Sequence, residues 1–141
     1  MLNIVLHEPE IPANTGNIGR TCVAAGARLH LIEPLGFRLT EKNLKRAGMD
    51  YWAQLDVRTY IDFEDFWTKI REPGFTWRRR KLTRFIRKST MSRTAISCSA
   101  KRVRGIPEEI LVDYEDTCIR IPMIGEIRSL NLGNSAAIVR L

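Results

Sequence analysis

Cysteine and histidine are scarce in this chain of 141 residues. The three cysteines, Cys22, Cys98 and Cys118, are odd in number and lack the spacing of metal ligands. We therefore expect reduced thiols, with neither a disulfide framework nor a metal site. The two histidines, His7 and His30, have no nucleophile motif beside them, and we interpret both as structural.

Long hydrophobic runs are also missing. No stretch approaches the roughly 18 apolar residues that a membrane helix needs. The first seven residues carry no basic n-region and are followed by Glu8, so they predict a first strand and not a signal peptide. We therefore expect a cytoplasmic protein with no membrane partner. A hydrophobic content of 44% and a charged content of 28% predict one globular domain over residues 1–141.

Acidic residues are absent from residues 75–104, which contain eleven lysines and arginines. The other residues hold 12 basic and 16 acidic side chains, so this segment supplies the whole excess behind the net charge of +7. Neither a strand period nor a helix period persists in the segment, which predicts a solvated basic loop. Such a basic arm is typical of contact with nucleic acid.

Strand and helix patterns alternate along the first half of the chain. Strands are predicted at Leu2–Leu6 and at residues 28–32. A helix is predicted between them, with Asn14 or Thr15 as its cap and Gly26 as its end. Further helices are expected after Thr40, after Asp62 and within residues 129–139. The helix after Asp62 carries one apolar face, which is formed by Phe63, Phe66, Trp67 and Ile70. Alternation of this kind predicts an α/β fold with a mostly parallel sheet and helices on both faces.

Residues 8–20 read Glu-Pro-Glu-Ile-Pro-Ala-Asn-Thr-Gly-Asn-Ile-Gly-Arg and directly follow the first strand. Open α/β sheets bind their ligands where a strand gives way to a helix in this manner. Asn14 and Asn17 also fit simple helix capping, and Arg20 also fits a surface position. Glu8 and Glu10 fit either a carboxylate pair for acid–base work or an exposed loop edge.

Four segments, residues 8–20, 29–37, 120–123 and 129–135, together resemble the SPOUT-class RNA 2′-O-methyltransferases. The match is strongest to the small members of that class that modify the tRNA wobble nucleotide. The resemblance implies S-adenosylmethionine as methyl donor and the 2′-hydroxyl of a tRNA wobble cytidine or modified uridine as acceptor. It also implies a homodimer and a SPOUT-type fold with a C-terminal trefoil knot.

The resemblance also implies which residues form the site. Asn14 and Arg20 match the first motif, in which the arginine is catalytic. The cofactor-binding positions come from a loop and from the last motif, and they are Ile121, Pro122, Met123, Ser129, Leu130 and Asn134. Asn131 belongs to the same last motif. An arginine suits phosphate and ribose because its guanidinium is planar and always charged.

Residues 75–104 depart from the family pattern. The family carries a Phe-Gly-x-Glu string before a Gly-Ile-Pro turn, whereas residues 99–102 here read Ser-Ala-Lys-Arg. Codons for Ile96–Val103, shifted by one base, can encode Tyr-Leu-Met-Phe-Gly-Lys-Glu-Ser. Similar shifts give family-like residues at 76–81 and continue the last helix beyond Val139. We therefore interpret these segments as frameshifted, and a genuine basic insertion is the alternative.

A second function stays open from the sequence alone. The chain also fits a catalytically inactive α/β RNA-binding module that uses the basic arm. Residues 75–104 separate the two readings, because the enzyme needs a glycine-containing cofactor loop there. The binding module needs only positive charge, and its affinity would fall steeply with salt.

Overall fold

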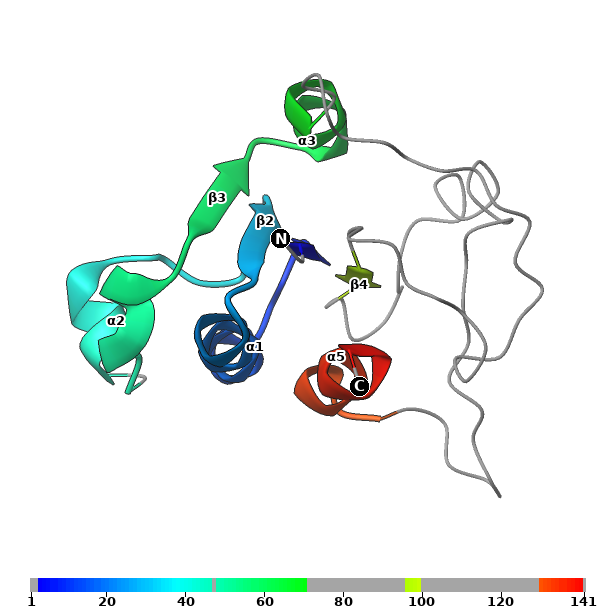
Figure 1. Cartoon of the computed structure of the whole chain (residues 1–141). Helices are drawn as coiled ribbons and strands as arrows, with labels where there is room; N and C mark the ends of the chain where they lie inside the picture. Colours follow the sequence, from blue (N-terminus) through cyan, green and yellow to red (C-terminus); the bar gives the residue numbers. More distant parts are fainter. Residues whose placement is uncertain (1–2, 47, 71–95, 100–129, 141) are drawn as a thin grey trace.

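The computed structural model describes residues 3–46, 48–70, 96–99 and 130–140. Nine elements follow one another within these ranges (Figure 1). They are β1 (Asn3–His7), α1 (Pro12–Ala25), β2 (Arg28–Ile32), α2 (Glu41–Arg46), the 3-10 helix η1 (Asp50–Gln54), β3 (Val57–Tyr60), α3 (Phe63–Ile70), β4 (Ile96–Ser99) and α5 (Leu132–Arg140). In the part of the chain so described, no helix is long and apolar enough to cross a membrane.

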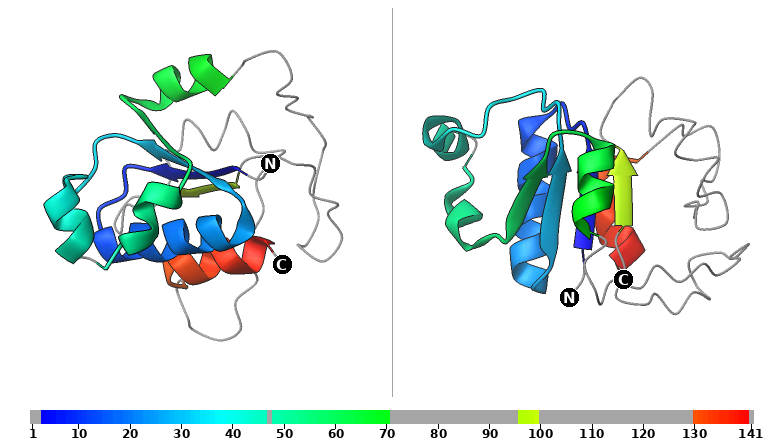
Figure 2. Two further views of the ribbon diagram at one scale, coloured as in Figure 1. Left: turned by 60° about the vertical axis from the view of Figure 1, so that its left-hand side comes forward. Right: turned by 90° about the horizontal axis from the view of Figure 1, so that it is seen from above.

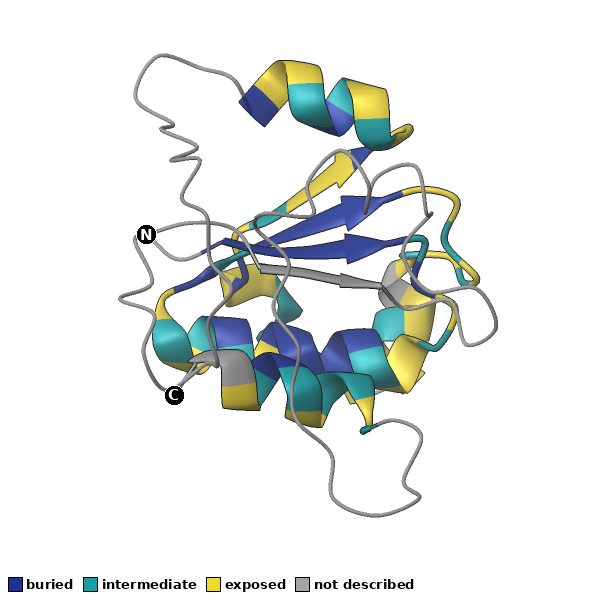
Figure 3. Ribbon diagram, turned by 90° about the vertical axis from the view of Figure 1, so that its right-hand side faces the viewer, coloured by how far each residue is buried: buried dark blue, intermediate teal, exposed yellow. Residues whose placement is uncertain are grey.

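The four described strands form one sheet in the order β3-β2-β1-β4, and every pairing is parallel. Val5 of β1 pairs with His30 of β2 on one side and with Ser97 of β4 on the other. β1 and β2 are buried along almost their whole length (Figure 3). Continuous burial is expected of parallel strands that are covered on both faces. The predicted parallel sheet is therefore confirmed.

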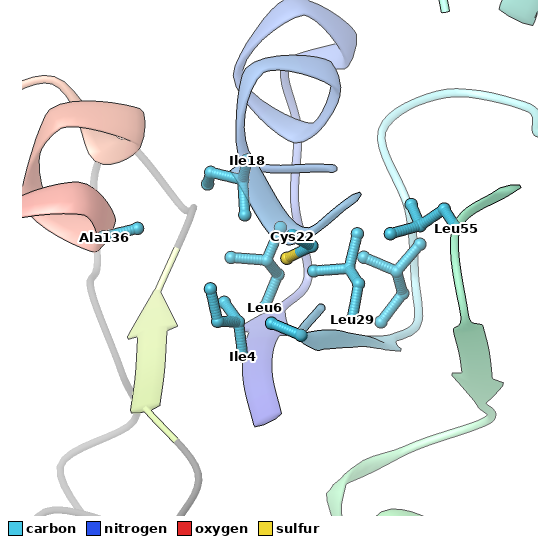
Figure 4. Close-up of a cluster of buried hydrophobic side chains, with 9 residues drawn as sticks. Ile4, Leu6, Ile18, Cys22, Leu29, Leu55 and Ala136 are labelled. Carbon is cyan, nitrogen blue, oxygen red and sulfur yellow. The ribbon is translucent and has the colours of Figure 1, made fainter. Parts of the chain in front are cut away.

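Helices cover both faces of the sheet, as predicted. α1 and α5 lie side by side on one face, and α3 lies on the other (Figure 1, Figure 2). The larger core cluster fills the space between the sheet and α1 with α5 (Figure 4), and it consists of Ile4, Leu6, Ile18, Cys22, Ala27, Leu29, Leu31, Leu55 and Ala136. Cys22 is a buried thiol in this cluster, as predicted. The predictions for the Cys98 and Cys118 side chains lie outside the described residues.

A second cluster joins the other face of the sheet to α3 and is built around aromatic rings. Phe66 and Ile70 of α3 are buried against Val5, Ile32 and Tyr60, and the predicted apolar face of α3 is confirmed. The ring of Phe66 meets the ring of Tyr60 edge-on, with centroids 5.1 Å apart. These contacts fix α3 over the end of β3.

His30 lies inside the sheet and is structural, as predicted. Its Nδ1 is 2.8 Å from the Tyr60 hydroxyl, and its Nε2 is 3.0 Å from Asn3 Oδ1. Since the amide oxygen only accepts, Nε2 carries the proton and Nδ1 accepts from the tyrosine. Burial, helped by the charges of Arg28 and Arg58, lowers the pKa of His30 from 6.5 to about 4. The imidazole is therefore neutral near pH 7.

The helix boundaries confirm the helices expected after Thr40 and after Asp62 and correct one predicted cap. The Asp62 Oδ1 accepts the Asp65 amide at 2.7 Å before α3, and the Thr40 Oγ1 accepts the Asn43 amide at 3.3 Å before α2. α1, however, begins at Pro12 and has no side-chain cap, so the predicted capping by Asn14 or Thr15 is wrong. Proline at the first helical position presets φ and lacks the amide that a cap would satisfy.

Gly26 ends α1 in the left-handed conformation (φ 60°), as predicted. β3 and η1 were not predicted by any local pattern. The predicted basic loop over residues 75–104 is wrong at Ile96–Ser99, because this stretch forms β4 and pairs with β1. The rest of that segment lies outside the described residues.

Candidate functional site

The loop between β1 and α1 is held in place by the loop that follows β2. The Glu8 amide donates to the Ile32 carbonyl, and the Gly36 amide donates to the Pro9 carbonyl, both at 2.9 Å. A Cβ on Gly36 would lie 2.7 Å from the Cα of Glu10, so only glycine permits this approach. These hydrogen bonds hold the start of the first motif at the carboxyl edge of the sheet. The strand order reverses between β2 and β4 around β1, and ligands bind at such points in open α/β sheets.

The structure brings the first and last motifs together at this edge. The Asn131 Nδ2 donates to Asn14 Oδ1 at 3.2 Å, although the two residues are 117 positions apart. The Asn131 Oδ1 accepts the Gly133 amide at 2.9 Å and so caps α5. A Cβ on Gly133 would lie 3.6 Å from the Cβ of Asn17, which shows how closely α5 approaches α1. Asn14 and Asn17 therefore face α5 from within α1 and do not cap it.

Two of the six predicted cofactor positions are described. Leu130 is half-buried immediately before the cap of α5, and Asn134 is exposed in its first turn. The other four, Ile121, Pro122, Met123 and Ser129, lie outside the described residues. Across the described ranges, no three His, Cys, Asp or Glu side chains gather in a group that could hold a metal ion.

Arg20 projects from α1 toward a different neighbour. Its Nη2 donates to the Gly48 carbonyl at 3.4 Å and lies 3.9 Å from the Asp50 carboxylate. Asn14 and Arg20 are six residues apart, which on an α-helix separates them by about 120° around the axis. The structure therefore places the two predicted catalytic residues on different sides of α1. The Arg20 side chain is 67% exposed, so its charge is available to a ligand.

The ring of Tyr51 packs against the guanidinium of Arg20. The Arg20 guanidinium lies 5.0 Å from the centre of the Tyr51 ring, within the range of a cation–π contact. The Tyr51 hydroxyl donates to the Gly16 carbonyl. Burial raises the pKa of Tyr51, and the positive charge of Arg20 opposes this rise. The phenol is therefore protonated near neutral pH and remains a donor.

Glycine at position 16 allows the segment Gly48–Tyr51 to pack onto α1. A Cβ there would lie 2.8 Å from the Cε of Met49 and 3.3 Å from the hydroxyl of Tyr51. Sequence reasoning missed Gly48, Asp50 and Tyr51 as neighbours of Arg20. The only signal available was the glycine of the first motif, because a small residue in a helix face permits close packing.

Joined motifs at the carboxyl edge of a parallel sheet are typical of ligand-binding α/β enzymes. The protein-family model described as SpoU rRNA Methylase family matches residues 1–140. A tRNA (cytidine(34)-2'-O)-methyltransferase from Saccharophagus degradans is 44% identical over 141 residues, which cover 99% of this chain and 91% of the relative. The chain therefore belongs to the SpoU methylase family.

Solved structures share the fold. One of them is described as "Structural insights into the 2-OH methylation of C/U34 on tRNA". It has a TM-score of 0.83 at 37% identity, and the match covers 99% of this chain and 91% of that chain. The AdoMet-bound rRNA methyltransferase from Sinorhizobium meliloti has a TM-score of 0.76 at 23% identity, over 98% of this chain and 53% of that chain. The predicted SPOUT-type fold is confirmed, whereas the predicted knot lies outside the described residues.

Proposed function

We propose that this chain transfers a methyl group from S-adenosylmethionine to the ribose 2′-hydroxyl of the tRNA wobble nucleotide, a cytidine or a modified uridine. The observation that carries the proposal is the contact between Asn14 and Asn131, which joins the first and last motifs at the carboxyl edge of the sheet. The relative from Saccharophagus degradans is named for this reaction at cytidine 34.

The described part of the proposed cofactor site fits S-adenosylmethionine. The half-buried Leu130 offers an apolar edge for the adenosine, and the exposed Asn134 amide offers both a donor and an acceptor. The resemblance adds four further positions, Ile121, Pro122, Met123 and Ser129. When bound, this cofactor supplies a methyl group that is activated by a sulfonium charge.

Arg20 binds and orients the RNA in this proposal. A guanidinium is a planar, permanently charged donor, which makes it a strong ligand for phosphate and ribose but a poor proton acceptor. Arg20 therefore holds the 2′-hydroxyl in line with the methyl group and a neighbouring phosphate beside it. That phosphate oxygen takes the hydroxyl proton. Positioning of this kind lowers a barrier by several kcal/mol, and by roughly 7–11 kcal/mol in the best cases.

The proposal treats residues 1–141 as one methyltransferase domain that contains an anomalous basic segment at 75–104. The single match of the family model to residues 1–140 supports one domain. The resemblance further implies a homodimer, and we propose that it acts in the cytoplasm. Light scattering of the purified chain, with and without tRNA, tests the dimer.

Methyl transfer to tRNA tests the function directly. The purified chain is incubated with labelled S-adenosylmethionine and unmodified tRNA, and the digested RNA is examined by mass spectrometry for 2′-O-methylated nucleosides. We expect one product at the wobble position. Arg20→Ala should lower the rate by about 100-fold or more. Arg58→Ala removes another exposed arginine, from β3, and should leave the rate unchanged.

Two outcomes would contradict the proposal. Methylation at another nucleotide would refute the wobble assignment. RNA binding without any methyl transfer, with an affinity that falls steeply with salt, would favour the inactive RNA-binding module.

A further inference from the structure

A pocket of about 290 Å³ lies between the start of α1 and α2, beside the segment that holds Arg20. Pro12, Leu44 and Met49 supply its apolar lining, and Met49 is buried. This volume is close to the lower end of the usual range for small-ligand sites, about 300–1,000 Å³. The pocket is therefore matched to one compact group and not to a long ligand.

The remaining lining of the pocket is one aromatic ring and three polar side chains, two of them basic. It consists of Phe37, Arg38, Asn43 and Arg46, and no aspartate or glutamate is among the described residues that line it. Arg38 and Arg46 are exposed, and Phe37 is half-buried. One guanidinium group can donate two parallel hydrogen bonds to a phosphate, and an aromatic ring stacks on any nucleic acid base. Together these groups fit a nucleotide, with the phosphate on the arginines and the base on Phe37.

The pocket is shaped before any ligand arrives. The Asn43 Nδ2 donates to the Arg38 carbonyl at 3.1 Å, which ties the approach to α2 onto the helix itself. The Met49 amide donates to the Leu44 carbonyl at 3.0 Å, which fixes the turn after α2. A ligand would therefore spend little free energy on ordering these walls.

The same short segment joins the pocket to Arg20. Met49 lines the pocket and packs against Gly16 of α1. Its neighbour Gly48 accepts a hydrogen bond from Arg20, and Tyr51 lies beneath the guanidinium. A nucleotide in the pocket would thus lie next to the residue that orients the reacting ribose.

We propose that this pocket binds one single-stranded nucleotide of the substrate RNA, next to the nucleotide that is methylated. The inference rests on the proposed function for the identity of the RNA. The charge of the lining argues against the cofactor as occupant, because two guanidinium groups repel a sulfonium cation and attract a phosphate. The pocket is therefore an RNA subsite separate from the cofactor positions on α5.

Binding of a fluorescein-labelled anticodon stem-loop RNA to the full chain tests this assignment. Arg46→Gln should weaken binding about tenfold and lower the salt slope by about 1, because one phosphate contact is lost. Phe37→Ala should weaken binding about tenfold without changing the salt slope, because only stacking is lost. Lys42→Gln is the matched control: it removes one exposed charge from α2 outside the pocket and should change affinity less than about twofold.

The outcomes distinguish a failure of the RNA-subsite proposal from a failure of the proposed function. A wild-type chain that neither binds the stem-loop nor methylates tRNA contradicts the proposed function. A wild-type chain that does both, with Arg46→Gln and Lys42→Gln equally affected, refutes the pocket alone. Loss of S-adenosylmethionine binding in Phe37→Ala, measured by calorimetry, would assign the pocket to the cofactor and refute the RNA subsite. Since Phe37 is half-buried, Phe37→Leu and a thermal unfolding curve accompany Phe37→Ala, and the leucine variant should fold normally yet bind RNA weakly.

Discussion

The Arg20 guanidinium lies 5.0 Å from the centre of the Tyr51 ring, and the Tyr51 hydroxyl donates to the carbonyl of Gly16, one helical turn earlier in α1. Tyr51 therefore contacts two residues of α1 that lie one helical turn apart. A cation over an exposed aromatic face gains roughly 0.5–1 kcal/mol, and the hydroxyl fixes where that face lies. The exposed Asp50 carboxylate, 3.9 Å from Arg20, adds little in water. Tyr51 is thus a positioning residue for Arg20.

Variants of Tyr51 separate the ring from the hydroxyl. Tyr51→Leu removes both and should lower kcat about tenfold, with KM changed less than about twofold, because the arginine loses its support and not its charge. Tyr51→Phe keeps the ring and should restore most of kcat. It should lower the free energy of unfolding by about 1 kcal/mol through the lost hydrogen bond. Steady-state methylation and urea unfolding measure these effects, and equal kcat losses in both variants would argue against positioning by the ring.

Asn131 has two separable contacts. Asn131→Asp keeps an oxygen to cap α5 but cannot donate to Asn14, so the chain should fold with nearly normal stability and methylate tRNA poorly. Asn131→Ala removes both contacts and should also lower the free energy of unfolding by about 1 kcal/mol. Thermal unfolding and methylation rates, measured on the same preparations, distinguish the two. Normal activity in Asn131→Asp would mean that the amide contact is only structural.

His30 should make stability depend on pH. Its pKa falls from 6.5 to about 4 on folding, so the unfolded chain binds more protons between these values. Stability is therefore fully present above pH 6.5 and is lost as the pH falls toward about 4, by an amount of the order of 3 kcal/mol. His30→Gln offers both an amide donor and an acceptor without titrating. Urea unfolding over this pH range should show a flatter profile for His30→Gln, and parallel profiles would exclude His30 as the cause.

The position of β4 bears on the reading frame of the basic segment. Ile96–Ser99 pairs with β1, yet it reads Ile-Ser-Cys-Ser, whereas strands of parallel sheets are usually continuous apolar runs. The one-base shift gives Tyr-Leu-Met-Phe over the same stretch. We expect resequencing of the gene across codons 70–106 to restore that apolar frame. An unchanged sequence, with an intact mass of 16.2 kDa, would instead establish a genuine basic insertion.

Elements with a strong local signal could be predicted from the sequence. β2 has its predicted bounds because its apolar run lies between Gly26 and Pro34, and both residues interrupt regular structure. α3 carries its own cap at Asp62 and a buried face at helical spacing. The alternation of such elements predicted the fold class. Residues 8–20 predicted that the candidate site lies where the first strand gives way to a helix.

Features that depend on distant contacts could not be predicted in this way. β3 is only four residues long and exposes Arg58 and Thr59, so its strand character comes from pairing with β2 and not from its own pattern. The contact between Tyr51 and Gly16 spans 35 positions, and no local spacing indicates it. For β4, the polar residues between Ile96 and Ser99 conceal a strand that only the sheet reveals.

The contact between Asn14 and Asn131 also has a consequence for protein synthesis. Its two halves leave the ribosome 117 residues apart, so a growing chain holds β1, α1 and the first motif long before α5 exists. Contacts between such distant residues form late, since the long intervening loop must be closed first. A growing chain whose α5 has not yet left the ribosome therefore lacks the joined motifs. We expect methylation to begin only when α5 has packed against α1.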